Sequence, residues 1–442
     1  MITRLAIARW LHERSGSVIV AAAVVGLAAR LAFGFLYWVD KPLTHDEGEY
    51  LELARNLAAG HGLTYDPLPP QPPDEIPPQR FGRAPGYPAF LAALISLGSV
   101  DAQPRSTPAV VKLAQAVVGS IGVIVIGLLA ARAGNPAAGA LAAIGAAVHP
   151  PLVWICAYAL SEALYSVLAL ACALILLDAT ASPRSGQRSP LIAVALAGAL
   201  AGIAALVRPV MVLFVALYAA WLLLRRVPVH AAVFVLGAAI VIAPWTQQSS
   251  ERARRFVLIA TEGGVTFWTG NHPLARGEGD LAANPQLKSA DMELRARHRQ
   301  LDADALEPIY YREAFDHIRA DPARWLGLMG RKVFYQWIPV GPSYRQHSPL
   351  YTATSIGSYL AVLPFGIAGL VWLVRNRRVP VVLLLLAASQ VLAGLIFLPQ
   401  ERFRIPVIDP VLLIFAAVWL ASRATALAGP FSYRRPDDQK KP

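Results

Sequence analysis

Long stretches of apolar residues, almost free of charge, recur along this 442-residue chain, and they constrain its fold more than any other feature. Hydrophobic residues make up 56% of the chain and charged residues only 15%, whereas a soluble globular chain carries about 25% charged residues. Many of the stretches reach the roughly 20 residues needed to cross the hydrocarbon core of a bilayer. The sequence therefore predicts an all-α fold, a polytopic bundle of transmembrane helices.

The bundle is predicted to have about ten spans. The stretch from 190 to 224 is too long for one crossing, and Arg208-Pro209 interrupts it with a residue that breaks the hydrogen-bond ladder of a helix. Two short crossings are preferred there, and a single crossing is the alternative. The spans are expected near 17–38, 109–131, 136–153, 159–178, 190–207, 209–224, 228–245, 353–374, 379–398 and 405–423.

Basic residues lie mostly in the short connections on one side of these spans, which sets the expected orientation. The chain has 40 Lys and Arg against 28 Asp and Glu, a formal net charge of +12. With the N-terminus inside, the cytoplasmic segments are rich in arginine and the short outer connections are poor in it, as the positive-inside rule requires. We therefore expect a multi-pass protein of the cell membrane with both termini cytoplasmic. No soluble domain interleaves arginine with aromatic residues, so the positive charge does not indicate a nucleic-acid partner.

Two long polar segments face the extracytoplasmic side in this topology, and both are expected to carry short interfacial helices. The expected division of the chain is an N-terminal transmembrane module (1–245) with its first outer loop (about 40–108), an extracytoplasmic loop region (246–352), C-terminal transmembrane helices (353–424) and a cytoplasmic tail (425–442).

The first outer loop begins with an acidic pair, Asp46 and Glu47, directly after the first span. Apolar residues recur at three- and four-residue spacing from 47 to 57, which predicts an amphipathic helix on the membrane surface, capped by His45 or Asp46. A rigid proline-rich stretch follows from 67 to 78. In a purely structural interpretation the acidic pair only begins a surface helix, and alone it is a weak catalytic motif.

The second outer loop is expected to start a helix at Asp321-Pro322, with the aspartate as N-cap and the proline in the first turn. Arg331 and Lys332 on this helix are expected at the level of the lipid head groups. His272 follows a turn region with aromatic residues, and a lone histidine seldom binds a metal.

A carboxylate at the outer membrane surface suits one kind of chemistry. A sugar carried on a lipid phosphate lies at that depth, its acceptor hydroxyl needs a general base, and partial burial tunes an aspartate towards that task. The leaving group is a phosphate, so cationic side chains must offset its charge. The outer-face candidates are Arg83, Arg208, Arg402 and Arg404.

Several short segments, taken in order along the chain, resemble those of known enzymes. They are His45-Asp46-Glu47-Gly-Glu-Tyr50, Arg83-Ala-Pro-Gly-Tyr87-Pro, Ser161-Glu162, Arg208-Pro209 and Glu401-Arg402-Phe-Arg404-Ile-Pro406. The ordered set resembles the membrane glycosyltransferases of the C-type fold. The similarity is greatest to the protein O-mannosyltransferase and aminoarabinose-transferase relatives, which are called glycosyltransferase family 39-like.

The resemblance implies an enzyme that moves a sugar from a polyprenyl-phosphate-linked donor to an acceptor hydroxyl of a protein, a lipid or a glycan. In that family the aspartate after the first helix is regarded as the catalytic base; it falls on Asp46, and the acid that follows it falls on Glu47. No cofactor is implied, a divalent metal and a diphosphate-linked donor stay open, and membrane lipids are the remaining expected partner. The positions expected to bind substrate are Arg83, Tyr87, Glu162, Arg208, Glu401, Arg402 and Arg404.

Several of these residues also have a structural interpretation. Glu162 is a favourable charge at a helix N-terminus, Arg208 suits a side chain that reaches the interface, and Glu401 with Arg402 suits a local ion pair. For the whole chain, a transporter or lipid flippase would place charges near the bilayer midplane and show inverted repeats. Here the charges cluster outside the expected spans and no repeat is evident. A non-catalytic membrane subunit of the same fold is the second alternative.

Overall fold

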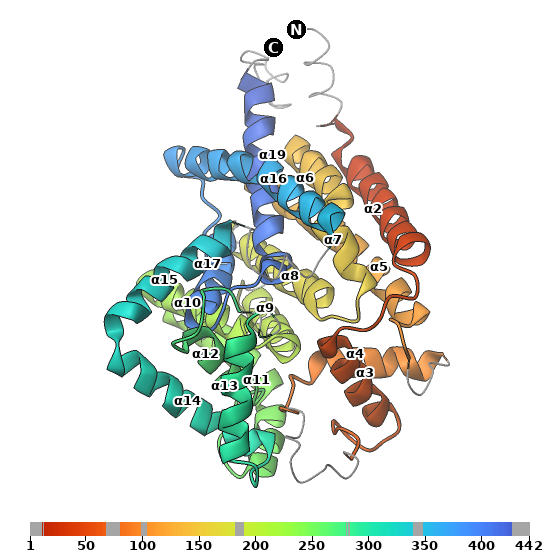
Figure 1. Ribbon diagram of the computed structural model, residues 1–442. Coiled ribbons are helices and arrows are strands. Elements are labelled where there is room, and N and C mark those ends of the chain that lie inside the picture. Colours follow the sequence, from red (N-terminus) through yellow and green to blue (C-terminus); the bar gives the residue numbers. More distant parts are fainter. Residues whose placement is uncertain are drawn as a thin grey trace, which may run out of the picture.

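The computed structural model describes residues 11, 13–67, 80–98, 104–181, 190–279, 281, 283–338 and 348–426. All regular elements in these ranges are helices (Figure 1). The expected proline-rich stretch after Pro67 and the part of the expected tail from residue 427 onwards lie outside the described residues.

Every expected span contains a helix at the expected place. These are α2 (Ser15–Ala32) continued by the π-helical turn η1 (Phe33–Tyr37), α5 (Ala109–Ala133), α6 (Pro136–Val148) followed by α7 (Pro150–Trp154) and the 3-10 turn η2 (Ile155–Ala157), α8 (Glu162–Ala181), α9 (Pro190–Val207), α10 (Met211–Leu224), α11 (Pro228–Ala253), α16 (Pro349–Arg375), α17 (Val381–Ile396) and α19 (Ile408–Ala426).

By length and composition, five of the described helices can cross a membrane, or six if the bent pair of α6 with α7 and η2 is one span. The five are α2 with η1, α5, α8, α11 and α16, whereas α9, α10 and α17 are apolar but shorter. The region from 190 to 224 forms two helices separated at Arg208-Pro209, as the missing N–H of proline predicts. The all-α bundle is confirmed, while the total of ten spans and the cytoplasmic position of the termini stay predictions.

The two loops that are expected to face outward, called the outer loops below, fold into short helices. The first forms α3 (His45–Ala58) and α4 (Gly86–Leu97), the second forms α12 (Gly263–Asn271), α13 (Pro285–Arg297), α14 (Ala303–Ala320) and α15 (Pro322–Trp337), and α18 (Glu401–Arg404) joins α17 to α19. The start of α2 and the end of α19 lie at the top of Figure 1, and α3, α4, α13 and α14 lie towards the other end. The expected helix start is confirmed, because Oδ1 of Asp321 accepts a hydrogen bond from the Arg324 amide at 2.9 Å.

Glycines let the bundle helices approach one another closely. A Cβ at Gly198 in α9 would lie 2.2 Å from the carbonyl oxygen of Phe234 in α11, and one at Gly369 in α16 would lie 2.0 Å from that of Phe415 in α19. The backbones therefore touch at these crossings, as is common among membrane helices. This close packing holds the ends of the helices that the outer loops connect.

Glu47 fixes the start of α3. Oγ1 of Thr44 accepts a hydrogen bond from the Glu47 amide at 3.4 Å, and Oε2 of Glu47 accepts one from the Thr44 amide at 2.9 Å, which makes a capping box. Oε1 of Glu47 accepts from the Thr107 hydroxyl at 2.7 Å and from the Ala159 amide at 2.8 Å. The side chain is buried, and it ties α3 to the segments that precede α5 and α8.

The expected cap of this helix, His45 or Asp46, is wrong. Thr44 has an extended backbone at the N-cap position, and its hydroxyl reaches the amide three residues on. His45 and Asp46 are the first two residues inside the helix, so the Asp46 side chain is left for other partners.

Lys332 on α15 is completely buried, which corrects the expectation that it meets lipid head groups. Its Nζ donates to Oδ1 of Asn271 at 3.2 Å and to the carbonyl oxygens of Leu395 and Phe397 at 2.8 and 2.7 Å. The last carbonyl groups of a helix have no partner inside the helix, so the C-terminus of α17 favours a cation. Lys332 thereby joins α15 and α12 to the bundle.

Replacing Glu47 by glutamine is expected to lower the free energy of unfolding by about 2–4 kcal/mol, because an amide presents N–H groups to partners that are all donors. Thermal unfolding of the detergent-solubilised protein measures the loss. The matched control is Glu293→Gln on α13, where the side chain is exposed. A Glu47→Gln protein as stable as the control would contradict this structural role.

Replacing Lys332 by methionine is expected to cost about 1–3 kcal/mol, because methionine fills a similar volume but removes the ammonium donor from the carbonyl oxygens of Leu395 and Phe397. Oδ1 of Asn271 keeps its hydrogen bond from Nε1 of Trp325 at 2.9 Å. The same unfolding measurement applies, with Lys288→Met at an exposed position of α13 as the control. Equal unfolding temperatures for the two variants would show that the buried ammonium group adds no net stability.

Candidate active site

Asp46 lies between two arginines that come from distant parts of the chain. Its Oδ1 accepts from Nη2 of Arg83, in the segment before α4, at 2.9 Å, and its Oδ2 accepts from Nη2 of Arg402 on α18. Burial alone raises the pKa of the Asp46 carboxyl, but the charges and hydrogen bonds of Arg402 and Arg83 outweigh burial and hold that pKa well below its usual range. Asp46 is therefore ionised and held from both sides.

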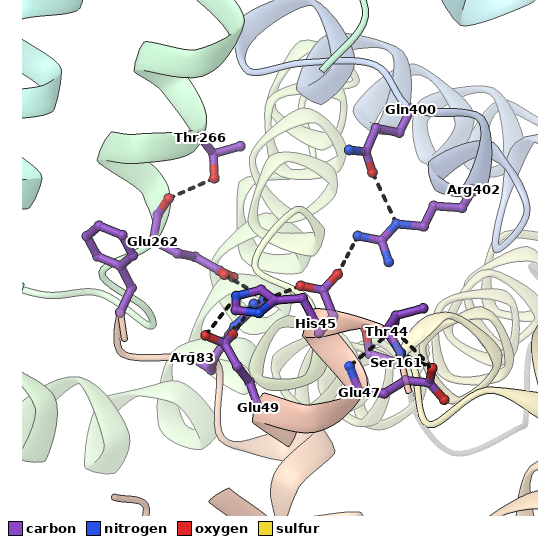
Figure 2. Close-up of polar contacts among 12 residues, drawn as sticks. Thr44, His45, Glu47, Glu49, Arg83, Ser161, Glu262, Thr266, Gln400 and Arg402 are labelled. Carbon is purple, nitrogen blue, oxygen red and sulfur yellow. Dashed lines mark hydrogen bonds and ion pairs between the residues drawn. The ribbon is translucent and has the colours of Figure 1, made fainter. Parts of the chain in front are cut away.

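Arg83 is shared among three carboxylates (Figure 2). Its Nε donates to Oε2 of Glu49 at 2.9 Å, its Nη2 bonds to both Glu49 and Asp46, and its Nη1 lies 3.0 Å from Oε2 of Glu262. The guanidinium also lies over the Tyr50 ring, 5.2 Å from the centroid. These partners surround the Arg83 side chain, which is only 15% exposed.

Glu262 brings the second outer loop into the site. It immediately precedes α12, and its carboxylate has Arg83 as its close cation. Burial raises the pKa of Glu262, and the positive charge of Arg83 offsets this only in part. On the other side of Arg83, the pKa of Glu49 is lowered, because hydrogen bonds from His45 and Arg83 and their charges outweigh burial.

A second cluster of acidic and basic side chains lies beside Asp46, at the start of α8 and the end of α9. Oε1 of Glu162 lies 2.8 Å from Nη1 of Arg208, and the same guanidinium nitrogen donates to Oγ of Ser161 at 3.1 Å. Nε of Arg402 lies 4.0 Å from Glu162 and donates to Oε1 of Gln400 at 3.1 Å. Arg402 thus stands between the two carboxylates of Asp46 and Glu162.

The structure brings Asp46, Arg83, Glu162, Arg208 and Arg402 together, as expected for one site. Figure 2 shows Glu47 turned towards Thr44 and away from Arg83 and Glu262, in the buried position already described. Asp46 therefore faces the arginines, whereas Glu47 stabilises the start of α3.

Tyr87, Glu401 and Arg404 have other surroundings. Tyr87 is fully buried, and its hydroxyl accepts from Nε2 of Gln115 at 3.1 Å. Arg404 points into the bundle, where its Nε lies 3.3 Å from Asp409 and its guanidinium lies 3.8 Å from the centre of the Tyr359 ring. Arg402 and Arg404 are two positions apart on α18, so they leave the helix on opposite sides. Glu401 is the first residue of that helix and is partly buried.

The sequence interpretation missed two acids of this site. Glu49 follows Asp46 by three residues on α3, and this spacing places both on one helix face, so the helical pattern contained that signal. Glu262 belongs to the other outer loop, and no local pattern connects it to Asp46. Among the described residues, no group of three or more His, Cys, Asp or Glu side chains is arranged to hold a metal ion.

Comparison with solved structures shows which known fold this is. The chain is similar to the oligosaccharyltransferase of Archaeoglobus fulgidus, both tethered with an acceptor peptide (TM-score 0.57, 13% identity, 95% of this chain and 51% of that chain) and in complex with Zn and sulfate (0.54, 15%, 93% and 49%). It also aligns with ArnT from Cupriavidus metallidurans bound to undecaprenyl phosphate (0.41, 14%, 91% and 77%). No protein-family model and no curated protein matches the sequence.

This chain spans about half the length of the oligosaccharyltransferase that it matches. The alignment nevertheless covers 93% to 95% of this chain at TM-scores above 0.5. The resemblance seen in the sequence motifs is thereby confirmed at the level of the fold. The chain has the C-type fold of the membrane glycosyltransferases.

Proposed function

We propose that this protein is a membrane glycosyltransferase that moves a sugar from a polyprenyl-phosphate-linked donor to an acceptor hydroxyl on the extracytoplasmic side, with Asp46 as the general base. One observation carries the proposal: the carboxylate of Asp46, at the start of α3, contacts arginines from two other segments of the chain. A carboxylate beside several cations is what a reaction with a phosphate leaving group needs. A protein of similar fold, the oligosaccharyltransferase of Archaeoglobus fulgidus, has a solved structure in complex with an inhibitory peptide and a dolichol-phosphate.

The proposed reaction is a single displacement. The acceptor oxygen forms a bond to the anomeric carbon, the bond from that carbon to the phosphate oxygen breaks, and its electron pair stays on the phosphate. The acceptor proton passes to the Asp46 carboxylate. Arg402 and Arg208 both lie on the Glu162 side of Asp46. Because they are cations, they stabilise the negative charge that develops on the phosphate. The acceptor is a hydroxyl of a protein, a lipid or a glycan.

The support for an enzyme over a transporter is the position of the charges. The acid–base network joins α3, α12 and α18 to the ends of α8 and α9. Some buried charges depart from the expectation, because Lys112 and Asp409 lie in α5 and α19 within expected spans. Another is Arg30, which is buried within α2. Its guanidinium bonds to the carbonyl oxygens of Gly26, Ala146 and Ala147, at 2.9, 3.5 and 3.5 Å, so it contacts the neighbouring helix backbone. Arg30 therefore has a packing role between α2 and α6.

Asp46→Asn tests the proposal. A strain that lacks this chain is complemented with the wild type or the variant, and transfer of labelled sugar from the polyprenyl-linked pool into glycans is followed. Loss of the general base is expected to slow transfer by about 10²–10⁴-fold. Transfer is compared per amount of folded protein, because Arg83 and Arg402 each lose a charged partner in this variant.

The matched control is Asp316→Asn, because that aspartate is exposed on α14 and distant in sequence from every site residue. Its transfer rate is expected to equal that of the wild type. A non-catalytic subunit would tolerate Asp46→Asn, so normal transfer by that variant would refute the assignment of Asp46 as the base.

A further inference from the structure

The three arginines of the site differ in how firmly their carboxylates hold them. Arg83 contacts Asp46, Glu49 and Glu262, and Arg208 pairs with Glu162 at 2.8 Å. Arg402 has one close carboxylate, Asp46, because its other acid neighbour lies 4.0 Å away. Its side chain is also the most exposed of the three, at 31% against 15% for Arg83 and 18% for Arg208. Arg402 is therefore the arginine that an incoming anion reaches first.

Arg402 also holds Asp46, the residue proposed as the general base. A carboxylate held between two guanidinium groups has little affinity for a proton. The phosphate of the donor and the carboxylate of Asp46 are both anions that bind a guanidinium in the same way, so they compete for Arg402. If the phosphate takes Arg402, Asp46 keeps Arg83 as its remaining partner and gains proton affinity.

We propose that Arg402 exchanges partners during the reaction: in the free protein it holds Asp46, and on donor binding it moves to the donor phosphate and releases Asp46. This inference rests on the proposed function and deepens it, because it assigns the phosphate of the lipid donor to one arginine. It also makes the donor bind before the acceptor is activated. By thermodynamic linkage, the phosphate raises the pKa of Asp46 by the same coupling with which Asp46 weakens phosphate binding.

A measurement of phosphate binding, without any sugar transfer, tests the exchange. If Asp46 competes with the phosphate for Arg402, then removing the carboxylate charge tightens phosphate binding. Purified full-length protein is titrated with undecaprenyl phosphate in detergent micelles, and intrinsic tryptophan fluorescence gives the Kd. Asp46→Asn is expected to lower this Kd by about fivefold or more, the low end of couplings between linked binding events.

Two further variants separate exchange from a general change in charge. Glu262→Gln removes the same charge from the same network but from the side of Arg83, so its Kd is expected to stay within about twofold of the wild type. Arg402→Gln is expected to weaken binding, and adding Asp46→Asn to it is expected to have no further effect, because the competed partner is gone. Titration with inorganic phosphate shows whether the lipid chain is needed.

Three outcomes would overturn the exchange alone: an unchanged or higher Kd for Asp46→Asn, equal tightening by Asp46→Asn and Glu262→Gln, or tightening by Asp46→Asn that persists without Arg402. If the wild type does not bind undecaprenyl phosphate, the donor class of the proposed function falls together with the exchange. Gel filtration and thermal unfolding establish that each variant is folded, and Asp46→Ser replaces Asp46→Asn if the latter is not.

Discussion

The hydrogen bonds of the Glu47 carboxylate set the geometry of the outer site. Both of its oxygens are used, one in the capping box with Thr44 and the other on the hydroxyl of Thr107 and the amide of Ala159. They fix the start of α3 against two segments that lead into the bundle. The direction of the first helical turn follows from this anchorage, and with it the direction in which Asp46 leaves the helix. Every contact between Asp46 and an arginine depends on that direction.

Charges this close together and this far withdrawn from water must be balanced within the protein. Four carboxylates (Asp46, Glu49, Glu162 and Glu262) contact three arginines, and most of these side chains are largely withdrawn from water. Removing one partner from a buried pair typically costs about 3–5 kcal/mol, because the other charge is left uncompensated. The network therefore stabilises the arrangement of two outer loops, and an anion that enters must replace a carboxylate on its arginine.

The bundle was predictable because its signals are local: apolar stretches of spanning length gave the helices, and Arg208-Pro209 gave the break between α9 and α10. The central part of the site was predictable for a similar reason, since Asp46 directly follows the first span. The remaining features depend on tertiary contacts. Glu262 reaches Arg83 from the other loop. Lys332 is buried where carbonyl oxygens at the C-terminus of α17 accept hydrogen bonds from its ammonium group. Arg404 lies on the side of α18 opposite Arg402. No spacing in the sequence contains the relations of Glu262 and Lys332, and the opposite directions of Arg402 and Arg404 follow from their spacing only because that segment is helical.

The one-turn helix α18 therefore bears two arginines with different tasks. Arg402 faces the outer network, while Arg404 is bound to Asp409 at the start of α19, whose other oxygen lies 3.3 Å from His149 at the end of α6. Ion pairs thus hold α18 on both of its sides. A displacement of α18 with Arg402 would therefore also change the contact of Arg404 with Asp409, and through Asp409 the link between α19 and α6.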